Sequence, residues 1–415
     1  MLINETTWKF IKDHANDDVR KVALKGAKDL EVDLTMALQQ IAGKQTARQK
    51  LPTWAAVEGI VYPPHLNMEQ CSSEQTARYK ALLTGNGQRF VDLTGGFGVD
   101  FYWISQGYEE SVYIEKNPEL CAISSENFRL LNRKCEILCL PASAYLNDMP
   151  HASLVYLDPA RRNEHGGRTY SIADCSPNVL ELMPLLIRKA DRVMLKLSPM
   201  LDWRQAVKDI EGTTANGQLA HVTHVHIVSV DNECKEMIIQ MENTRLANEQ
   251  HKMNVVCVNL LSNGGQQAFV FGGQPPFSTQ TEDTTRSIST ISTLNPRFLY
   301  EPNASIMKAG CFEAIEKQYG AHQVAFNSHL FLSSDEIADF PGRQFTILSI
   351  SSMNKNELNQ KLATMKRANI AVRNFPLSAE QLRKKLKLKE GGDDYLFAST
   401  AQDGRHLLYI CRKIR

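Results

Sequence analysis

The spacing of apolar residues predicts that the chain begins with helices. Up to about residue 80, apolar side chains recur every three or four positions, which is the spacing of one helix face. The series runs through Val19, Ala23, Ala27, Leu30, Leu34, Leu38 and Ile41. Ser72 followed three positions later by Gln75 forms a capping box, so we expect a helix to start there.

Short apolar runs replace this pattern from Arg89 onward and predict a sheet. The expected strands are residues 90–91, 111–114, 136–140, 154–157, 192–196, 222–230 and 236–241. The first five alternate with helical stretches, which predicts right-handed crossovers and parallel strands. The last two are joined by residues 231–235 alone, a connection too short for a crossover. They should form an antiparallel hairpin on a mostly parallel sheet.

The rest of the chain predicts a hairpin, a linker and a small module. Residues 254–258 and 267–271 flank an Asn-Gly-Gly turn and should pair as a hairpin. Residues 272–286 are rich in Gly, Pro, Ser and Thr, which is typical of a linker or a long loop. From Gln344 the pattern predicts a strand, a helix (355–367), a strand, a helix (378–388) and two strands.

These patterns predict an α/β fold in four parts. The expected parts are an N-terminal helical region (1–69), an α/β domain (70–241), a hairpin extension with a linker (242–343) and a small α+β domain (344–415). Charge separates the last part from the others. The whole chain carries +1, but residues 344–415 hold 14 Lys and Arg against six acids, which leaves about −7 for the rest. A basic module on an acidic body indicates a polyanionic partner.

Composition favours a reduced, cytoplasmic protein without a membrane partner. The apolar fraction of 43% is enough for packed cores, yet no run approaches the roughly 18 residues that a membrane span needs. The N-terminus lacks the basic start and apolar centre of a signal peptide. Nine scattered cysteines without a C-x-x-C pair argue against a disulfide framework and a zinc ribbon. His221, His224 and His226 lack an acidic or cysteine ligand beside them, so we expect no metal.

A glycine-rich turn after the first strand indicates a nucleoside site. The run from Asp92 to Gly98 reads D-L-T-G-G-F-G, and Gly96 and Gly98 would let the backbone approach a ligand closely. Glu115 ends the second strand 17 residues beyond Gly98, roughly the interval at which such folds bind ribose hydroxyls. Asp92 would repel a pyrophosphate but could accept a hydrogen bond from an ammonium group. A cationic amino-acid nucleoside therefore fits better than NAD, although a plain strand-to-helix turn remains the alternative.

These motifs resemble the class I S-adenosylmethionine-dependent methyltransferases. VDLTGGFG, YIEKNP, the turn PAS and LDPARR carry the resemblance over residues 70–241 and imply a Rossmann-like sheet. QCSSEQTARYKA, KLSPMLDW and EPNASIMKAG are similar to a bacterial subgroup with a THUMP-like C-terminal domain. The resemblance implies S-adenosylmethionine as cofactor. The implied cofactor-binding residues are Asp92, Thr94, Gly95, Gly96, Gly98, Glu115, Lys116, Ala142, Ser143 and Asp158. Thr94 stands where the family usually has the first glycine of this motif, and many members of the family have Asp at the position of Ser143.

The stretch Asp158-Pro159-Ala160-Arg161 occupies the place of the [DNS]-P-P-[YFW] motif of amine methyltransferases. Asp158 would accept a hydrogen bond from the nitrogen, and Arg161 stands where that motif has an aromatic that holds the base. The tetrad also resembles the D-P-A-R of RNA 5-methyluridine methyltransferases, but Ser198 replaces their nucleophilic cysteine, so we reject that route. Asp158, Pro159 and Arg161 are the expected catalytic residues. A helix N-cap, or an ion pair with Arg161 or Arg162, is the alternative role of Asp158.

Basic residues in two places are candidates for substrate binding. Those near the cleft are Arg161, Arg162, Arg168 and Lys196, and those on the basic terminal helix are Arg383, Lys384 and Lys387. The alternatives are a solvated loop for Arg162 and Arg168, a side chain that snorkels from a strand end for Lys196, and a solvated helix face for the terminal set. We therefore expect a methyltransferase that acts on a base nitrogen of structured RNA, either tRNA or rRNA. The rival hypotheses are a protein or small-molecule methyltransferase, and a non-catalytic RNA-binding protein that retains the cofactor fold.

Overall fold

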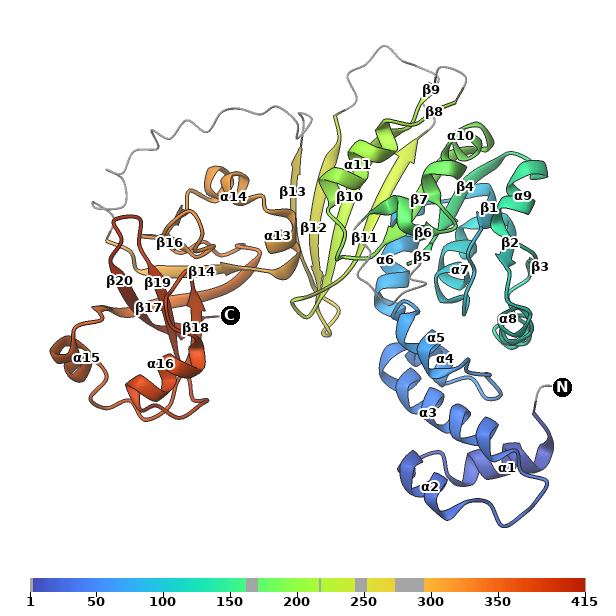
Figure 1. The fold of residues 1–415 in the computed structure, drawn as a ribbon, viewed down its shortest axis with the longest axis horizontal. Coiled ribbons are helices and arrows are strands. Elements are labelled where there is room, and N and C mark those ends of the chain that lie inside the picture. The colour runs from blue at the N-terminus through green and yellow to red at the C-terminus, as the bar shows by residue number, and fades with distance from the viewer. Residues whose placement is uncertain (1–2, 162–170, 216–217, 243–251, 273–294, 415) are drawn as a thin grey trace. The chain divides into compact units, whose positions relative to one another are not determined.

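The structure is a computed structural model that describes residues 3–161, 171–215, 218–242, 252–272 and 295–414. The chain forms two compact units (Figure 1). The first holds residues up to Val225 together with Glu236–His251, and the second holds His226–Lys235 and Lys252–Arg415. The expected linker at 272–286 lies outside the described residues, apart from Gly272.

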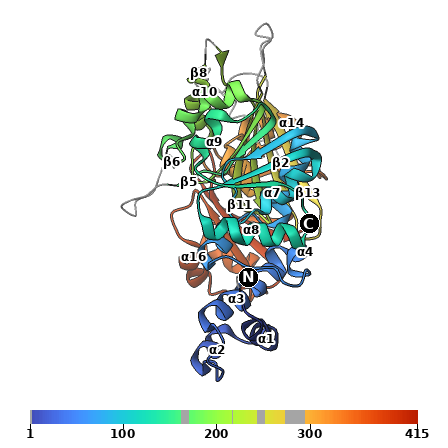
Figure 2. The same ribbon diagram turned by 90° about the vertical axis from the view of Figure 1, so that its right-hand side faces the viewer.

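Six helices open the first unit, as the apolar spacing predicts. They are α1 (Glu5–Asp13), α2 (Val19–Lys25), α3 (Leu34–Lys50), α4 (Pro52–Ala55), α5 (His65–Gln70) and α6 (Glu74–Thr84). Both views show α1–α3 standing clear of the sheet of this unit (Figures 1 and 2). The expected cap of α6 is off by one residue. Ser73, rather than Ser72, accepts the hydrogen bond from the backbone N–H of Thr76, because the Ser72 hydroxyl donates elsewhere.

A mostly parallel sheet forms the core of the first unit. Its strands are β1 (Gly87–Asp92), β2 (Tyr108–Glu115), β3 (Glu136–Cys139), β4 (Ala152–Leu157), β7 (Ala190–Leu197) and β11 (Glu233–Glu242). They follow the spatial order β3-β2-β1-β4-β7-β11. The first five run parallel, and β11 is antiparallel to β7 and follows β10 (His221–Val230) through a short turn. The predicted α/β class and the antiparallel terminal hairpin are confirmed.

The connections between these strands contain helices and a few short elements. The helices are α7 (Val99–Ile104), α8 (Pro118–Leu130), α9 (Ala142–Asp148), α10 (Val179–Lys189) and α11 (Trp203–Glu211). The short elements are η1 (Ser105–Gly107), η2 (Ile172–Asp174), β5 (Ala160–Arg161), β6 (Cys175–Ser176), β8 (Thr214–Ala215) and β9 (Gln218–Leu219).

The second unit is built on a hairpin and a separate seven-stranded sheet. The hairpin pairs β12 (Asn254–Leu260) with β13 (Gln266–Gly272), as predicted. The seven strands are β14 (Phe298–Pro302), β15 (His322–Gln323), β16 (Phe331–Ser333), β17 (Gly342–Ser352), β18 (Asn369–Arg373), β19 (Asp394–Thr400) and β20 (His406–Lys413). The helices are α13 (Ala304–Ala309), α14 (Phe312–Tyr319), α15 (Lys355–Lys361) and α16 (Ala379–Leu386). Helix α15 is shorter than expected, since Ala368 already donates its backbone N–H to Lys389.

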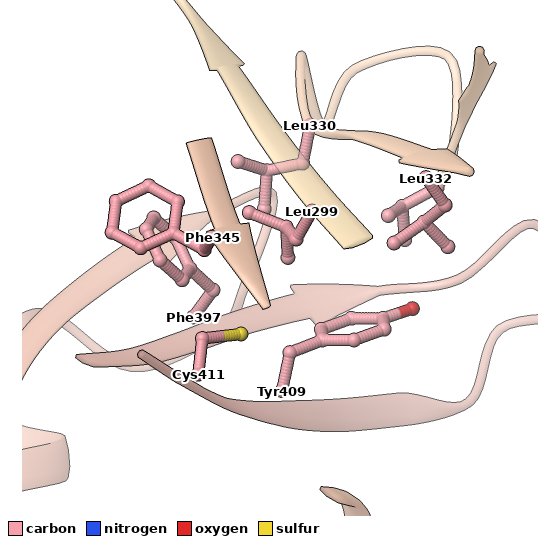
Figure 3. Packing of buried hydrophobic residues seen from close by; sticks show 8 residues of the cluster. Leu299, Leu330, Leu332, Phe345, Phe397, Tyr409 and Cys411 are labelled. Atoms are coloured by element: carbon pink, nitrogen blue, oxygen red, sulfur yellow. The ribbon is translucent and has the colours of Figure 1, made fainter. Parts of the chain in front are cut away.

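Residues 298–341, which the apolar pattern placed in an extension and linker region, belong to this same sheet. Strand β14 pairs with β17, so the sheet is continuous across residue 342. Buried side chains from both sides of that point pack in one cluster (Figure 3). Its members are Leu299, Val324, Leu330, Leu332, Phe345, Phe397, Tyr409 and Cys411. A second cluster on α15 and α16 includes Leu358, Leu382, Leu388 and Leu396.

Candidate functional site

The neighbouring strand β2 holds the glycine turn after β1 in place. The backbone N–H of Gly95 donates to Ile114 at 2.7 Å, and a Cβ on Gly95 would lie 2.1 Å from the Tyr113 ring. Gly96 and Gly98 have φ angles of 56° and 84°, which only glycine adopts at little cost. At Gly96 a Cβ would meet nothing closer than 3.8 Å, so this face of the turn is open to a ligand.

Glu115 faces this open turn. Its Oε2 accepts a hydrogen bond of 2.9 Å from the Gly96 N–H, and its Oε1 accepts one of 2.9 Å from the Asn117 N–H. The carboxylate is therefore fixed against the glycine backbone, with lone pairs left for further donors such as ribose hydroxyls. Lys116 beside it is exposed. Ala142 and Ser143 open helix α9 directly after the neighbouring strand β3, and Ser143 is exposed at that edge.

Asp92 lies beneath the turn rather than on its surface. Its side chain is 1% exposed, and its Oδ1 accepts a hydrogen bond of 2.9 Å from the Thr94 N–H. Burial raises the pKa of Asp92 well above its usual range, and the nearby acids Asp100, Asp158 and Glu115 raise it further. A cationic ligand group beside this carboxyl would reverse that effect. The open turn, Glu115 and Asp92 together fit a nucleoside that carries an amino-acid cation.

Asp158 lies next to this turn on the other side of β1. Asp92 pairs with Tyr156 in the parallel register, and two residues further along the Asp158 N–H donates to the Thr94 hydroxyl at 2.6 Å. Pro159 is buried behind it. No helix follows, because Ala160 and Arg161 form strand β5, which pairs with β6. The alternative of Asp158 as a helix N-cap is therefore wrong.

The ion-pair partner of Asp158 is Lys196 at the end of β7. Lys196 Nζ lies 2.6 Å from Asp158 Oδ2, and the two side chains are 11% and 36% exposed. Lys196 is predicted to bind substrate phosphate, but its ammonium group already pairs with a carboxylate. The side chain of Arg161 and all of Arg162 and Arg168 lie outside the described residues, so their predicted roles stay predictions.

Behind Asp158 the fold buries a group of charges that the motifs do not reveal. Lys80 on α6 is fully buried and lies 3.2 Å from Asp100 Oδ1 and 2.5 Å from Glu236 Oε1. The hydroxyls of Ser72 and Tyr156 donate to Asp100 Oδ2 at 2.7 and 2.8 Å. We call this set the buried charge network; its members are Ser72, Lys80, Asp100, Tyr156, Lys196 and Glu236.

Pairing fixes the ionisation of two members of this network. Burial alone would raise the pKa of Asp100, but the ammonium groups of Lys80 and Lys196 lower it below its usual value. Burial alone would lower the pKa of Lys196, but the carboxylates of Asp158, Asp100 and Glu236 raise it. Both groups therefore carry their charges at neutral pH.

A signal for the buried charge network does exist in the sequence. Lys80 falls on the same helix stripe as Ala77 and Thr84, and Glu236 stands in the apolar run EMIIQM. Two opposite charges at positions that should be buried indicate a buried pair. Their separation by 156 residues in the chain hides which charge meets which.

The basic helix of the second unit folds as its leucines predict. Helix α16 has a capping box between Ser378 and Gln381, and Leu382 is fully buried beneath it. Lys387 caps the helix with a φ of 57° and is exposed. Arg383 and Lys384 each lie near an acid of the same module, at 3.8 Å from Glu390 and 2.9 Å from Glu380. The Lys384 pair is exposed and the Arg383 pair is long, so both salt bridges are weak and leave the cations available to phosphates.

The described residues also contain a cavity of about 590 Å³ among α1, α3 and residues 57–62. None of the predicted site residues lines it, so it is separate from the turn and from Asp158. Among the ranges that the structure describes, no helix is long and apolar enough to cross a membrane.

Comparisons with known proteins agree with this arrangement. Residues 342–413 match the family model of a THUMP domain-like domain, and residues 298–341 match that of a ferredoxin-like domain. A proposed methyltransferase from Porphyromonas gingivalis W83 has a crystal structure that is 30% identical in sequence. The match covers 100% of both chains with a TM-score of 0.81. No curated protein matches the chain.

Two more solved structures are similar at a lower level. A proposed class I S-adenosylmethionine-dependent methyltransferase from Listeria monocytogenes is 10% identical, with 62% of this chain and 93% of that chain covered and a TM-score of 0.39. The TrmK protein of M. capricolum, solved with S-adenosylhomocysteine, is 10% identical, with 43% and 73% covered and a TM-score of 0.31. Likenesses this slight do not bear on the assignment, which rests on the P. gingivalis structure.

Proposed function

The chain belongs to the class I S-adenosylmethionine-dependent methyltransferases with a THUMP-like C-terminal domain, and we propose that it methylates a base nitrogen in structured RNA, either tRNA or rRNA. One observation carries the proposal. The Asp158-Pro159 strand end lies beside the Thr94–Gly98 turn, so a hydrogen-bond acceptor adjoins the place where the cofactor would lie. In folds of this kind, ligands bind outside the carboxyl ends of the strands.

The residues around the turn have defined roles in this proposal. Gly96 and Gly98 let the backbone approach the cofactor, Glu115 accepts from the ribose hydroxyls, and Asp92 accepts from the ammonium group. Lys116, Ala142 and Ser143 border the adenine. When bound, S-adenosylmethionine supplies an electrophilic methyl group; its transfer forms an N–C bond, breaks the C–S bond with the electron pair going to sulfur, and leaves one proton to be lost from the nitrogen.

Asp158 orients that nitrogen and receives the proton. Its carboxylate accepts a hydrogen bond from the N–H, which points the lone pair at the methyl group. Because the Asp158 side chain is 36% exposed, the proton can pass on to water. Pro159 holds the strand end rigid, and Arg161 would stack on the base or hold its phosphate.

The charge of the C-terminal domain supports RNA as the substrate class. Residues 344–415 carry a net charge of +8, and four lysines, Lys384, Lys385, Lys387 and Lys389, are exposed on and after α16. A protein or small-molecule substrate would leave this charge without a partner. RNA phosphates would use it, with an affinity that falls steeply as salt is added.

Methyl transfer to RNA from a deletion strain tests the proposal directly. The purified protein is incubated with tritiated S-adenosylmethionine and total RNA from a strain that lacks the gene. Label should enter RNA from the deletion strain and not RNA from the parent strain, whose sites are already methylated. Mass spectrometry of the digested nucleosides then identifies the base. Label in proteins or small molecules, with none in RNA, would overturn the RNA assignment.

Asp158→Asn tests the role of the carboxylate. The amide cannot receive the proton, so we expect kcat to fall by about 100-fold or more. The KM for RNA should change little, and calorimetry should show S-adenosylmethionine binding intact. Asp148→Asn, at an exposed position on α9, is the matched control and should leave kcat unchanged. Full activity in Asp158→Asn would contradict the role.

A further inference from the structure

Lys196 cannot serve as a base, and its charge is already paired. The carboxylates of Asp158, Asp100 and Glu236 raise its pKa, so it remains an ammonium at working pH. Its Nζ lies 2.6 Å from one oxygen of Asp158, namely Oδ2. A buried cation in such surroundings cannot move to another partner without leaving a charge uncompensated.

This contact divides the two oxygens of Asp158 between separate tasks. Oδ2 is taken by Lys196, whereas no side chain among those the structure describes bonds to Oδ1. The backbone of the same residue is fixed by the hydrogen bond from its N–H to Thr94. With the backbone and one oxygen held, the carboxylate has a single orientation, and Oδ1 is the acceptor left for substrate.

The two acids that act on the charge of Lys196 from the buried side, Asp100 and Glu236, are themselves held in place. Asp100 accepts from Ser72 and Tyr156 and pairs with Lys80, and Glu236 pairs with the same lysine. These residues come from α6 with its preceding loop, α7, β4 and β11. The charges that act on Lys196 therefore have fixed positions.

We propose that Lys196 is a positioning residue for methyl transfer, which by holding Oδ2 of Asp158 directs Oδ1 to the substrate nitrogen. This inference rests on the proposed function. The nitrogen attacks the methyl carbon as the C–S bond breaks, and its N–H, held by Oδ1, passes its proton to that oxygen as the N–C bond forms.

Variants of Lys196 separate this role from a grip on RNA phosphate. Lys196→Met removes the charge, and we expect kcat to fall by about 30-fold or more with little change in the KM for RNA. Lys196→Arg should restore at least about a tenth of kcat.

A control variant and a measurement of cofactor binding accompany the Lys196 variants. Lys208→Met, at an exposed position on α11, should match the wild type in every measurement. Calorimetry with S-adenosylmethionine should give dissociation constants within about threefold for all variants. A higher KM and a weaker salt dependence of RNA binding, at unchanged kcat, would show a phosphate grip and overturn the proposal. So would a Lys196→Met enzyme with the kcat and the KM of the wild type.

If Lys196→Met alone does not fold, the double variant Lys196→Met with Asp158→Asn tests whether Lys196 acts through Asp158. Removing both charges of the pair should restore a thermal midpoint that Lys196→Met lowers. Its kcat should lie within about threefold of Asp158→Asn alone, since a positioning residue acts only through its partner. If the kcat losses of the two single variants multiplied in the double variant, Lys196 would act independently of Asp158. A wild-type enzyme that methylates no RNA would refute the proposed function itself and not the role of Lys196 alone.

Discussion

At the scale of single residues, Asp92 shows how burial prepares a group for a charged ligand. The carboxyl is buried at the end of β1, faces Asp100, Asp158 and Glu115, and accepts one backbone hydrogen bond. Because its pKa is raised, the free carboxyl keeps its proton to a higher pH than an ordinary aspartic acid does. A ligand ammonium beside it favours the ionised form, so binding should release that proton.

Cofactor affinity should therefore rise with pH. Below its raised pKa, Asp92 must lose a proton to pair with the ammonium, and that cost shrinks as the pH increases. Titration calorimetry from pH 5.5 to 7.5, in buffers of different ionisation enthalpy, should show tighter binding and less proton release at the higher pH. Asp92→Asn should bind more weakly with a flat pH profile, and Asp148→Asn should follow the wild type. A flat wild-type profile would exclude this role for Asp92.

At the scale of elements, the turn between β1 and α7 combines backbone strain with tight packing. Gly98 has a φ of 84°, and a Cβ there would lie 2.6 Å from the Phe128 ring on α8. Gly320, which follows α14, has a φ of 61° in the same left-handed conformation and nothing within 4 Å of a Cβ, so it carries similar strain without the clash. The two glycines therefore separate backbone conformation from packing.

Gly98→Ala should disturb the cofactor site, and Gly320→Ala should not. Either alanine costs about 1 kcal/mol for the left-handed conformation, but only the first must also push Phe128 and α8 aside. We expect Gly98→Ala to weaken S-adenosylmethionine binding by about tenfold or more and Gly320→Ala to leave it unchanged. Titration calorimetry checks both. Equal binding by the two variants would show that the turn tolerates a shift of α8.

How far the elements could be predicted depends on the range of the interactions that form them. The strands, the glycine turn and Glu115 at the end of β2 follow from local signals, since strand, turn and acid stand close together in the chain. Lys80, Asp100 and Glu236 could not be assigned to one another, because a buried pair between α6 and β11 depends on which strands are neighbours. The contact between Asp158 and Lys196 was missed for the same reason, since the two residues stand 38 positions apart in the chain.

At the scale of the whole molecule, different units carry the two proposed tasks. The cofactor turn, Asp158 and Lys196 belong to the first unit, and the basic helix α16 belongs to the second. If the second unit only holds RNA, loss of its charge should weaken binding without slowing the chemical step. Kinetics can separate these effects, because KM and kcat report on different stages of the reaction.

Neutralising the basic helix should therefore raise KM and leave kcat unchanged. The triple variant Arg383→Gln, Lys384→Gln, Lys387→Gln keeps the buried Leu382, so the helix should remain docked. We expect weaker RNA binding, with the slope of log affinity against log salt reduced by about one for each phosphate that the helix no longer binds. S-adenosylmethionine binding should be unaffected.

The matched control is Arg20→Gln, Lys21→Gln, Lys25→Gln on α2, where three exposed cations occupy a helix of similar length. If the control weakened RNA binding as much as the test variant, net charge rather than α16 would be responsible for RNA affinity. If kcat fell with KM unchanged, the second unit would take part in catalysis and not only in binding.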